Sequence, residues 1–161
     1  NPSLTVRLTN KELGIGKNEI IKQPTKIIIG NLKKSKNNNK LFANNANVII
    51  GSRLSAKQVE NLEYIEYKGR NFLEKFLKDL LSRNISSILV EGGQETLNTF
   101  IASNLFDELV IYTAPIFLGD GSINTLSLKP PNSIKKSTRL KKVKIERFKN
   151  DIKTTYYNTN I

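Results

Sequence analysis

Short apolar runs alternate with amphipathic segments along the chain, and their order restricts the fold more than any other feature. The runs TKIIIG (25–30) and ANVIIGS (46–52) are rich in isoleucine and valine and each reaches a glycine, which predicts buried strands. A third run of this type, SSILV (86–90), follows the amphipathic segment 70–83. Because strand–helix–strand order joins parallel strands through a right-handed crossover, these segments predict the parallel part of a sheet.

Two segments have the apolar spacing of amphipathic helices. The first is 70–83 and the second is QETLNTFIASN, 94–104. The apolar positions are Phe72, Leu73, Phe76, Leu77, Leu80 and Leu81 in the first, and Leu97, Phe100 and Ile101 in the second. We expect these apolar faces to pack inward.

The rest of the chain predicts three further strands, of which the last two are antiparallel. DELVIYTAPIFLG (107–119) predicts a strand that is interrupted at Pro115 and ends in a turn with two glycines. TRLKKVKIERF (138–148) and DIKTTYYNT (151–159) predict a hairpin. Together with strand-like patterns at 1–8 and 63–67 and polar loops at 9–22 and 31–40, this predicts one α/β domain, 1–161, with a mixed, mostly parallel sheet, flanking helices and a C-terminal antiparallel hairpin.

Histidine and cysteine are both absent, and this narrows the available chemistry. Ser-His-Asp and Cys-His catalysis are excluded within this chain, as are zinc sites built on His or Cys, so we expect no metal site. Carboxylates, Lys, Arg, backbone groups or a bound cofactor remain. The lack of cysteine, of a signal-peptide pattern and of an apolar run long enough to span a membrane predicts a cytoplasmic protein.

The chain carries a formal net charge of +12, which has two interpretations. One is a polyanionic partner such as nucleic acid, contacted by a basic cluster near the C-terminus. The cluster comprises Lys135, Lys136, Arg139, Lys141, Lys142, Lys144, Arg147 and Lys149. The other is AT-rich coding, since Lys far outnumbers Arg and both Asn and Ile are abundant. Strand alternation would place Lys142, Lys144 and Glu146 on one face, which describes a solvated edge strand and makes nucleic acid the weaker alternative.

The segment ILVEGGQETLNTFI (88–101) places a carboxylate and two glycines where a predicted strand passes into a predicted helix. In open α/β sheets, ligands bind outside the carboxyl ends of strands. A helix N-terminus offers free N–H groups to a phosphate, and glycine lets the phosphate approach the backbone. Glu91 and Gly92–Gly93 therefore form either a phosphate-binding corner or a tight turn beside a solvated acid, and their position alone leaves both alternatives open.

Three segments carry a resemblance to a known family. LVEGGQETLNTFIASNLFDELVIYTAPIFLGDG (89–121), NPSLTVRL (1–8) and QPTKII (23–28) resemble the reductase domain of the bifunctional riboflavin-biosynthesis pyrimidine deaminase/reductase family, in the same order. The resemblance implies a dihydrofolate-reductase-like fold. It also implies an N-terminally truncated domain, with its first strands and a zinc-dependent deaminase domain upstream of residue 1; the absence of methionine and a start at Asn1 agree with a fragment.

The resemblance also implies a reaction, which is the NADPH-dependent reduction of 5-amino-6-(5-phosphoribosylamino)uracil, and a homodimer. Leu4, Arg7 and Glu91 match substrate-contacting positions. The positions that match the cofactor-phosphate turn and helix start are Gly93, Gln94, Glu95, Thr96, Leu97, Asn98 and Thr99. Gly30–Asn31 departs from the Asp-Ser/Thr pair that the family carries there, so a cofactor contact at Asn31 is not expected. No residue is identified as the catalytic acid or base.

Two alternatives to this enzyme remain open. The first is a basic nucleic-acid-binding domain, which depends on the charge and the cluster described above. The second is an inactive fragment of the reductase that folds and dimerises without turnover.

Overall fold

The computed structural model describes residues 3–30, 40–42, 47–52, 62–67, 69 and 71–159. It divides the chain into two compact units, Asn1–Ser86 and Ser87–Ile161, and each is described by itself below. The expected loop 31–40, which includes Asn31, lies outside the described residues except for Lys40. The single domain expected over 1–161 stays a prediction.

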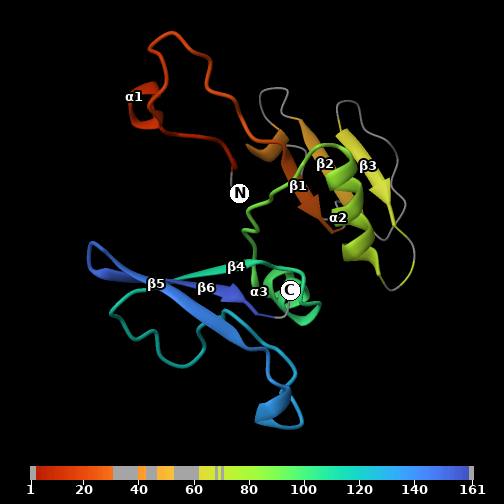
Figure 1. Cartoon of the computed structure of the whole chain (residues 1–161), viewed down its shortest axis with the longest axis vertical. Helices are drawn as coiled ribbons and strands as arrows, with labels where there is room; N and C mark the ends of the chain where they lie inside the picture. Colours follow the sequence, from red (N-terminus) through yellow and green to blue (C-terminus); the bar gives the residue numbers. More distant parts are fainter. Residues whose placement is uncertain are drawn as a thin grey trace. The chain divides into compact units, whose positions relative to one another are not determined.

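The first unit contains a parallel three-stranded sheet, as the isoleucine-rich runs predict (Figure 1). Its strands are β1 (Lys26–Ile29), β2 (Val48–Ser52) and β3 (Leu62–Glu66), in the order β1-β2-β3. β2 pairs in parallel with both neighbours, and each of its residues is buried. The central strand therefore forms the core of this unit, as expected for a parallel strand covered on both faces.

Helix α2 (Phe72–Ser82) supplies the other half of this core. Its side chains at Phe72, Leu73, Phe76 and Leu80 are buried, whereas Leu81, expected inward, is 62% exposed. A Cβ on Gly51 would lie 2.7 Å from the Phe76 ring, so this glycine of β2 gives the ring room to approach the sheet. The helix expected over 70–83 is confirmed.

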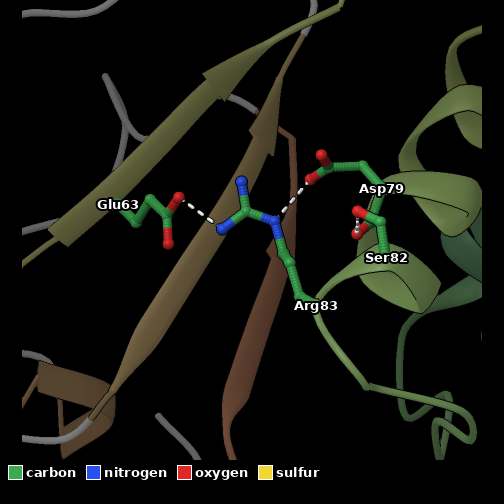
Figure 2. A network of polar contacts seen from close by, with 4 residues as sticks. All are labelled: Glu63, Asp79, Ser82 and Arg83. Atoms are coloured by element: carbon green, nitrogen blue, oxygen red, sulfur yellow. Dashed lines mark hydrogen bonds and ion pairs between the residues drawn. The ribbon is translucent and has the colours of Figure 1, made fainter.

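An ion-pair network extends from the C-terminal end of α2 to β3 (Figure 2). Arg83 donates from Nε to Asp79 Oδ2 at 2.7 Å and pairs through Nη1 with Glu63 Oε1. Ser82 Oγ donates to the carbonyl oxygen of Asp79 at 2.7 Å. One guanidinium thus links the end of the helix to a strand that precedes it in the chain.

The second unit contains α3 (Gln94–Ala102) and an antiparallel three-stranded sheet. Its strands are β4 (Glu108–Thr113), β5 (Leu140–Phe148) and β6 (Asp151–Asn158), with β6 in the centre. The hairpin expected at 138–148 and 151–159 is confirmed, and so is the strand within 107–119. The α/β class, with parallel strands first and an antiparallel hairpin last, is therefore confirmed.

The end of β6 is joined to the region between α3 and β4. Asn158 Nδ2 donates to Asn104 Oδ1 at 2.9 Å and to the Phe106 carbonyl at 3.0 Å. The Asn158 N–H donates to the Asp107 carbonyl at 2.9 Å. Because Asn158 is buried, these hydrogen bonds satisfy its polar groups and position the sheet against the end of α3.

The buried strand expected at 86–90 is wrong. Residues 85–90 have no regular secondary structure, and Leu89 is 85% exposed. An apolar run becomes a strand only where neighbouring strands accept and donate its backbone hydrogen bonds. This run begins at the boundary between the two units, and the structure assigns no ladder to it. The strand-like pattern at 1–8 likewise forms no strand over residues 3–8.

The loop expected at 9–22 contains a short helix, α1 (Asn10–Leu13). Thr9 and Glu12 form a capping box, and Gly14 ends the helix in the left-handed conformation. Asn10 Nδ2 donates to the carbonyl oxygens of Gly16 and Glu19, and these hydrogen bonds hold the loop that follows α1. In the part of the chain that the structure describes, no helix is both long and apolar enough to cross a membrane.

Candidate functional site

The corner at Glu91–Gly92–Gly93 leads directly into α3, and all three residues are exposed. Gly93 is the N-cap residue and supplies no side-chain cap. Its carbonyl accepts from the N–H groups of Thr96 and Leu97, at 3.1 and 3.2 Å. The N–H groups that precede these two have no acceptor within the helix, so the corner presents donors and a partial positive charge to an anion.

The two glycines of the corner lack a side chain for different reasons. A Cβ on Gly92 would lie 2.7 Å from the Cβ of Thr96, so packing inside the unit requires glycine there. A Cβ on Gly93 would meet no atom of the described residues within 4 Å, and its φ of −73° is open to any residue. Neither backbone strain nor packing explains Gly93. An open position at a helix N-terminus fits the close approach of a ligand phosphate.

Two side chains from the first turns of α3 hold a distant segment of the chain. Gln94 Nε2 donates to the Asn124 carbonyl at 2.7 Å. Asn98 binds the backbone of Ser127 twice, accepting from its N–H at 3.0 Å and donating to its carbonyl at 3.2 Å. Both amides were expected to contact a cofactor. The structure engages them with residues 29 and 30 positions away, and no local sequence signal announces these contacts.

The other expected cofactor residues lie on the same short stretch. Thr99 Oγ1 donates to the Glu95 carbonyl within the helix, at 2.7 Å. Leu97 and Thr96 are half-buried, and Glu95 is exposed. Of the expected cofactor residues, Gly93, Glu95 and Thr99 are therefore the exposed ones.

The expected substrate residues fall in both units. Leu4 and Arg7 belong to the first unit, and Glu91 belongs to the second. Leu4 is half-buried and has a φ of 47°, a left-handed conformation that is uncommon for a residue other than glycine. Arg7 is exposed, and the N–H of the neighbouring Val6 donates to Gln23 Oε1 at 2.9 Å. The backbone next to Arg7 is thus held by a hydrogen bond to the side chain of Gln23.

The basic cluster is partly neutralised on the antiparallel sheet. Glu146 lies between Lys144 Nζ at 2.7 Å and Lys153 Nζ at 3.1 Å, and hydrogen bonds from these lysines lower the pKa of Glu146. The register of β5 also shifts between Lys142 and Lys144, so the regular alternation assumed for Lys142, Lys144 and Glu146 does not hold across that point.

This chain matches a known protein family over most of its length. The family model described as RibD C-terminal domain matches residues 1–154. The chain belongs to the RibD C-terminal domain family. The resemblance seen at 1–8, 23–28 and 89–121 is thereby confirmed.

Individual RibD relatives cover nearly the whole chain. The riboflavin biosynthesis protein RibD of Aquifex aeolicus is 31% identical over 159 residues, which is 94% of this chain and 41% of that protein. The 5-amino-6-(5-phosphoribosylamino)uracil reductase of Buchnera aphidicola is 28% identical over 127 residues, 74% of this chain and 61% of that protein. The chain thus spans less than half the length of the RibD proteins that it matches over nearly all of its own length.

Solved structures show the same fold. RibD of Acinetobacter baumannii superposes with a TM-score of 0.79, over 98% of this chain and 43% of that one, at 19% identity. A Thermotoga maritima protein described as a diaminohydroxyphosphoribosylaminopyrimidine deaminase/5-amino-6-(5-phosphoribosylamino)uracil reductase gives 0.75 over 98% of this chain and 41% of that one, at 21% identity. At these identities the likeness establishes the fold that this RibD-family chain shares with them.

Proposed function

We propose that this chain is the reductase part of a riboflavin-biosynthesis enzyme, which reduces 5-amino-6-(5-phosphoribosylamino)uracil with NADPH. The observation that carries the proposal is the corner before α3, where Gly93 leaves space beside free backbone N–H groups. Membership of the RibD C-terminal domain family supports it, as does the relative from Buchnera aphidicola that is named as this reductase.

The corner fits a phosphate of the cofactor. Gly93 and the first N–H groups of α3 would hold that phosphate, which gains both hydrogen bonds and the favourable end of the helix dipole. When bound, NADPH supplies the hydride that reduces C1 of the ribosyl group in its open, imine form. The protein's own task is to align donor and acceptor and to exclude water.

The substrate side of the proposal rests on the match of Leu4, Arg7 and Glu91 to substrate-contacting positions of the family. Arg7 would grip the substrate phosphate through its planar guanidinium, and Leu4 would contact the same substrate. Glu91 would accept hydrogen bonds from a hydroxyl or amine of the ligand. A homodimer, a deaminase domain in the same polypeptide and a cytoplasmic location complete the proposal and remain predictions.

The first prediction tests the activity itself. The full-length protein, mixed with NADPH and the ribosylaminopyrimidine phosphate, is expected to consume NADPH at a rate that depends on substrate concentration. Loss of NADPH absorbance measures this rate, and omission of the substrate is the control. A full-length protein that oxidises no NADPH in response to substrate contradicts the assignment. Repeating the assay on residues 1–161 alone separates an active reductase from the inactive fragment.

A further inference from the structure

The side chain of Gln23 joins two segments of the first unit that lie far apart in the sequence. Its Oε1 accepts a hydrogen bond from the N–H of Val6 at 2.9 Å, across 17 positions of the chain. Val6 lies next to Arg7. In the part of the chain that the structure describes, no other hydrogen bond connects residues 3–8 to another segment. The position of the Arg7 backbone therefore depends on this contact.

The Gln23 end of this hydrogen bond is held close to the core. Pro24 fixes its own φ and restricts the residue before it to extended conformations. Only Pro24 and Thr25 separate Gln23 from Lys26, the first residue of β1. Lys26 is buried, and it pairs in parallel with Val48 of the central strand. The acceptor is thus carried by a short, restricted piece of backbone that leads into the sheet.

The loop 9–22 between the two ends has contacts of its own. Asn10 Nδ2 donates to the carbonyl oxygens of Gly16 and Glu19, at 2.8 and 2.7 Å. These contacts lie wholly inside the loop, as does the capping box of α1. Loss of the hydrogen bond between the two ends leaves them in place, so its specific effect is on the position of residues 4–7 relative to β1.

The segment that this hydrogen bond holds contains a strained residue. Leu4 has a φ of 47°, and a left-handed backbone is unfavourable for leucine. The hydroxyls of Ser3 and Thr5, on either side of it, are hydrogen-bonded to each other at 3.3 Å. A strained residue persists only where surrounding contacts hold it, and such residues gather at ligand sites. This indicates a segment kept in shape for what it presents, and Arg7 is its exposed charged side chain.

We propose that Gln23 is a positioning residue for Arg7. By accepting from the Val6 N–H, it holds the backbone beside Arg7 so that the guanidinium is in place before the substrate phosphate arrives. The inference rests on the proposed contact of Arg7 with that phosphate, and Gln23 itself does not touch the substrate. Without the hydrogen bond, only a fraction of the molecules hold Arg7 in the binding position, and the apparent affinity falls in proportion.

The test uses the full-length protein and three single variants. Gln23→Met keeps the length of the side chain and removes the acceptor. Gln23→Glu keeps an oxygen acceptor at the same reach, and it is compared in hydrogen exchange alone because its charge would itself repel the substrate phosphate. Asn18→Leu removes an exposed amide of the same loop and is the matched control. The measurements are hydrogen exchange of the Val6 amide, KM for the ribosylaminopyrimidine phosphate, kcat, and the Kd for NADPH.

The expected result is a loss confined to substrate binding. Gln23→Met should speed exchange of the Val6 amide and raise KM for the phosphorylated substrate by roughly two- to tenfold, the effect of one neutral hydrogen bond. Its kcat and its Kd for NADPH should match wild type. Gln23→Glu should keep the wild-type exchange of Val6, and Asn18→Leu should match wild type in every measurement.

A double variant separates positioning from direct contact. In an Arg7→Ala background, Gln23→Met should raise KM little further, because the group that Gln23 positions is gone. If the two effects multiply in full, Gln23 acts independently of Arg7 and the inference is wrong.

Other results also overturn the inference. A Gln23→Met protein with faster exchange at Val6 and a wild-type KM shows that the hydrogen bond does not position Arg7. A raised KM with unchanged exchange at Val6 shows that Gln23 acts by another route. An active wild type in which Arg7→Ala has no effect removes the role of Arg7 and this inference, and leaves the enzyme assignment standing. Wild-type protein without a substrate-dependent rate removes the proposed function as well, and this outcome needs no variant.

Discussion

At the scale of single residues, Gly93 is the position where a side chain should block a ligand without disturbing the protein. Gly93→Val is expected to keep the fold, because its Cβ meets no described atom within 4 Å, and to abolish stabilisation by NADPH. Gly93→Asn should also keep the fold and abolish stabilisation by NADPH. Because asparagine caps a helix better than glycine does, a weaker α3 would not explain the loss of that stabilisation. Melting temperatures with and without NADPH check this, since only a ligand that binds the native state raises them.

Gly92 provides the matched control for that experiment. A Cβ there would lie 2.7 Å from Thr96, so Gly92→Ala should lower stability by about 1–3 kcal/mol, the usual cost of overpacking. The two substitutions should therefore have different effects. Substitution at Gly92 lowers the melting temperature without ligand, and substitution at Gly93 removes the increase in melting temperature caused by NADPH. A Gly93→Val protein that NADPH still stabilises rules out the corner as the phosphate site.

Arg7 tests the substrate half of the proposal. Arg7→Ala should raise KM for the phosphorylated substrate by roughly tenfold to over a hundredfold, since a charge-assisted hydrogen bond is worth about 1.5–3 kcal/mol. Arg7→Lys should recover part of this, because an ammonium keeps the charge and loses the planar fork. NADPH affinity should barely change in either variant.

Lys11→Ala, in the exposed α1, is the control for the loss of one positive charge near Arg7 in the sequence. Steady-state kinetics at two salt concentrations separate a direct contact from the general attraction of a +12 protein, which salt screens more strongly. If Arg7→Ala behaves like Lys11→Ala, Arg7 is a solvated surface charge.

At the scale of elements, Arg83 fastens α2 to β3 (Figure 2). The Arg83 side chain is 31% exposed and has two carboxylate partners, Glu63 and Asp79. Arg83→Met should therefore lower the free energy of unfolding by about 1 kcal/mol, the upper part of the range for partly exposed pairs. Lys78→Met removes a more exposed pair with Glu74 on the same helix and should cost less than Arg83→Met, because solvent screens an exposed pair more strongly. Urea denaturation measures both, and equal costs would contradict a special role for Arg83.

At the scale of the whole molecule, charge predicts how stability responds to acid. The chain has 26 Lys and Arg side chains against 14 carboxylates, so protonation of the carboxylates raises the net charge from +12 toward +26. Hydrogen bonds lower the pKa of Glu12, Glu74 and Glu146 in the folded protein, from Thr9, Lys78 and Lys144 respectively. Their contribution is complete above the unfolded pKa of about 4.3 and is lost as the pH falls through the lower folded values.

The melting temperature is therefore expected to fall as the pH decreases below about 4.3. Added salt should partly restore it in acid, because screening reduces repulsion among the positive charges. Thermal denaturation over a pH series at two salt concentrations measures both effects. A melting temperature that stays constant down to about pH 3 would show that these carboxylates have the same pKa in the folded and unfolded chain.

The sequence by itself determined the elements whose patterns are local. The isoleucine-rich runs gave β1 and β2, the spacing of Phe72, Phe76 and Leu80 gave α2, and the alternation at 138–159 gave the C-terminal hairpin. The family motifs at 89–121 located the glycine corner and the RibD family. Each of these depends on neighbours within one turn or one strand, which periodicity records directly.

The tertiary structure decided whatever depends on partners far apart in the chain. The run 86–90 has the composition of a buried strand, yet no ladder is assigned to it, because hydrogen-bond partners come from other segments. Gly92 and Gly93 are identical in sequence, and only the contact with Thr96 separates a packing requirement from an open position. Asn98 and Gln94 were expected to bind a cofactor, and their amides engage a segment about thirty residues away. Such contacts join positions that no local pattern connects, so only the folded chain reveals them.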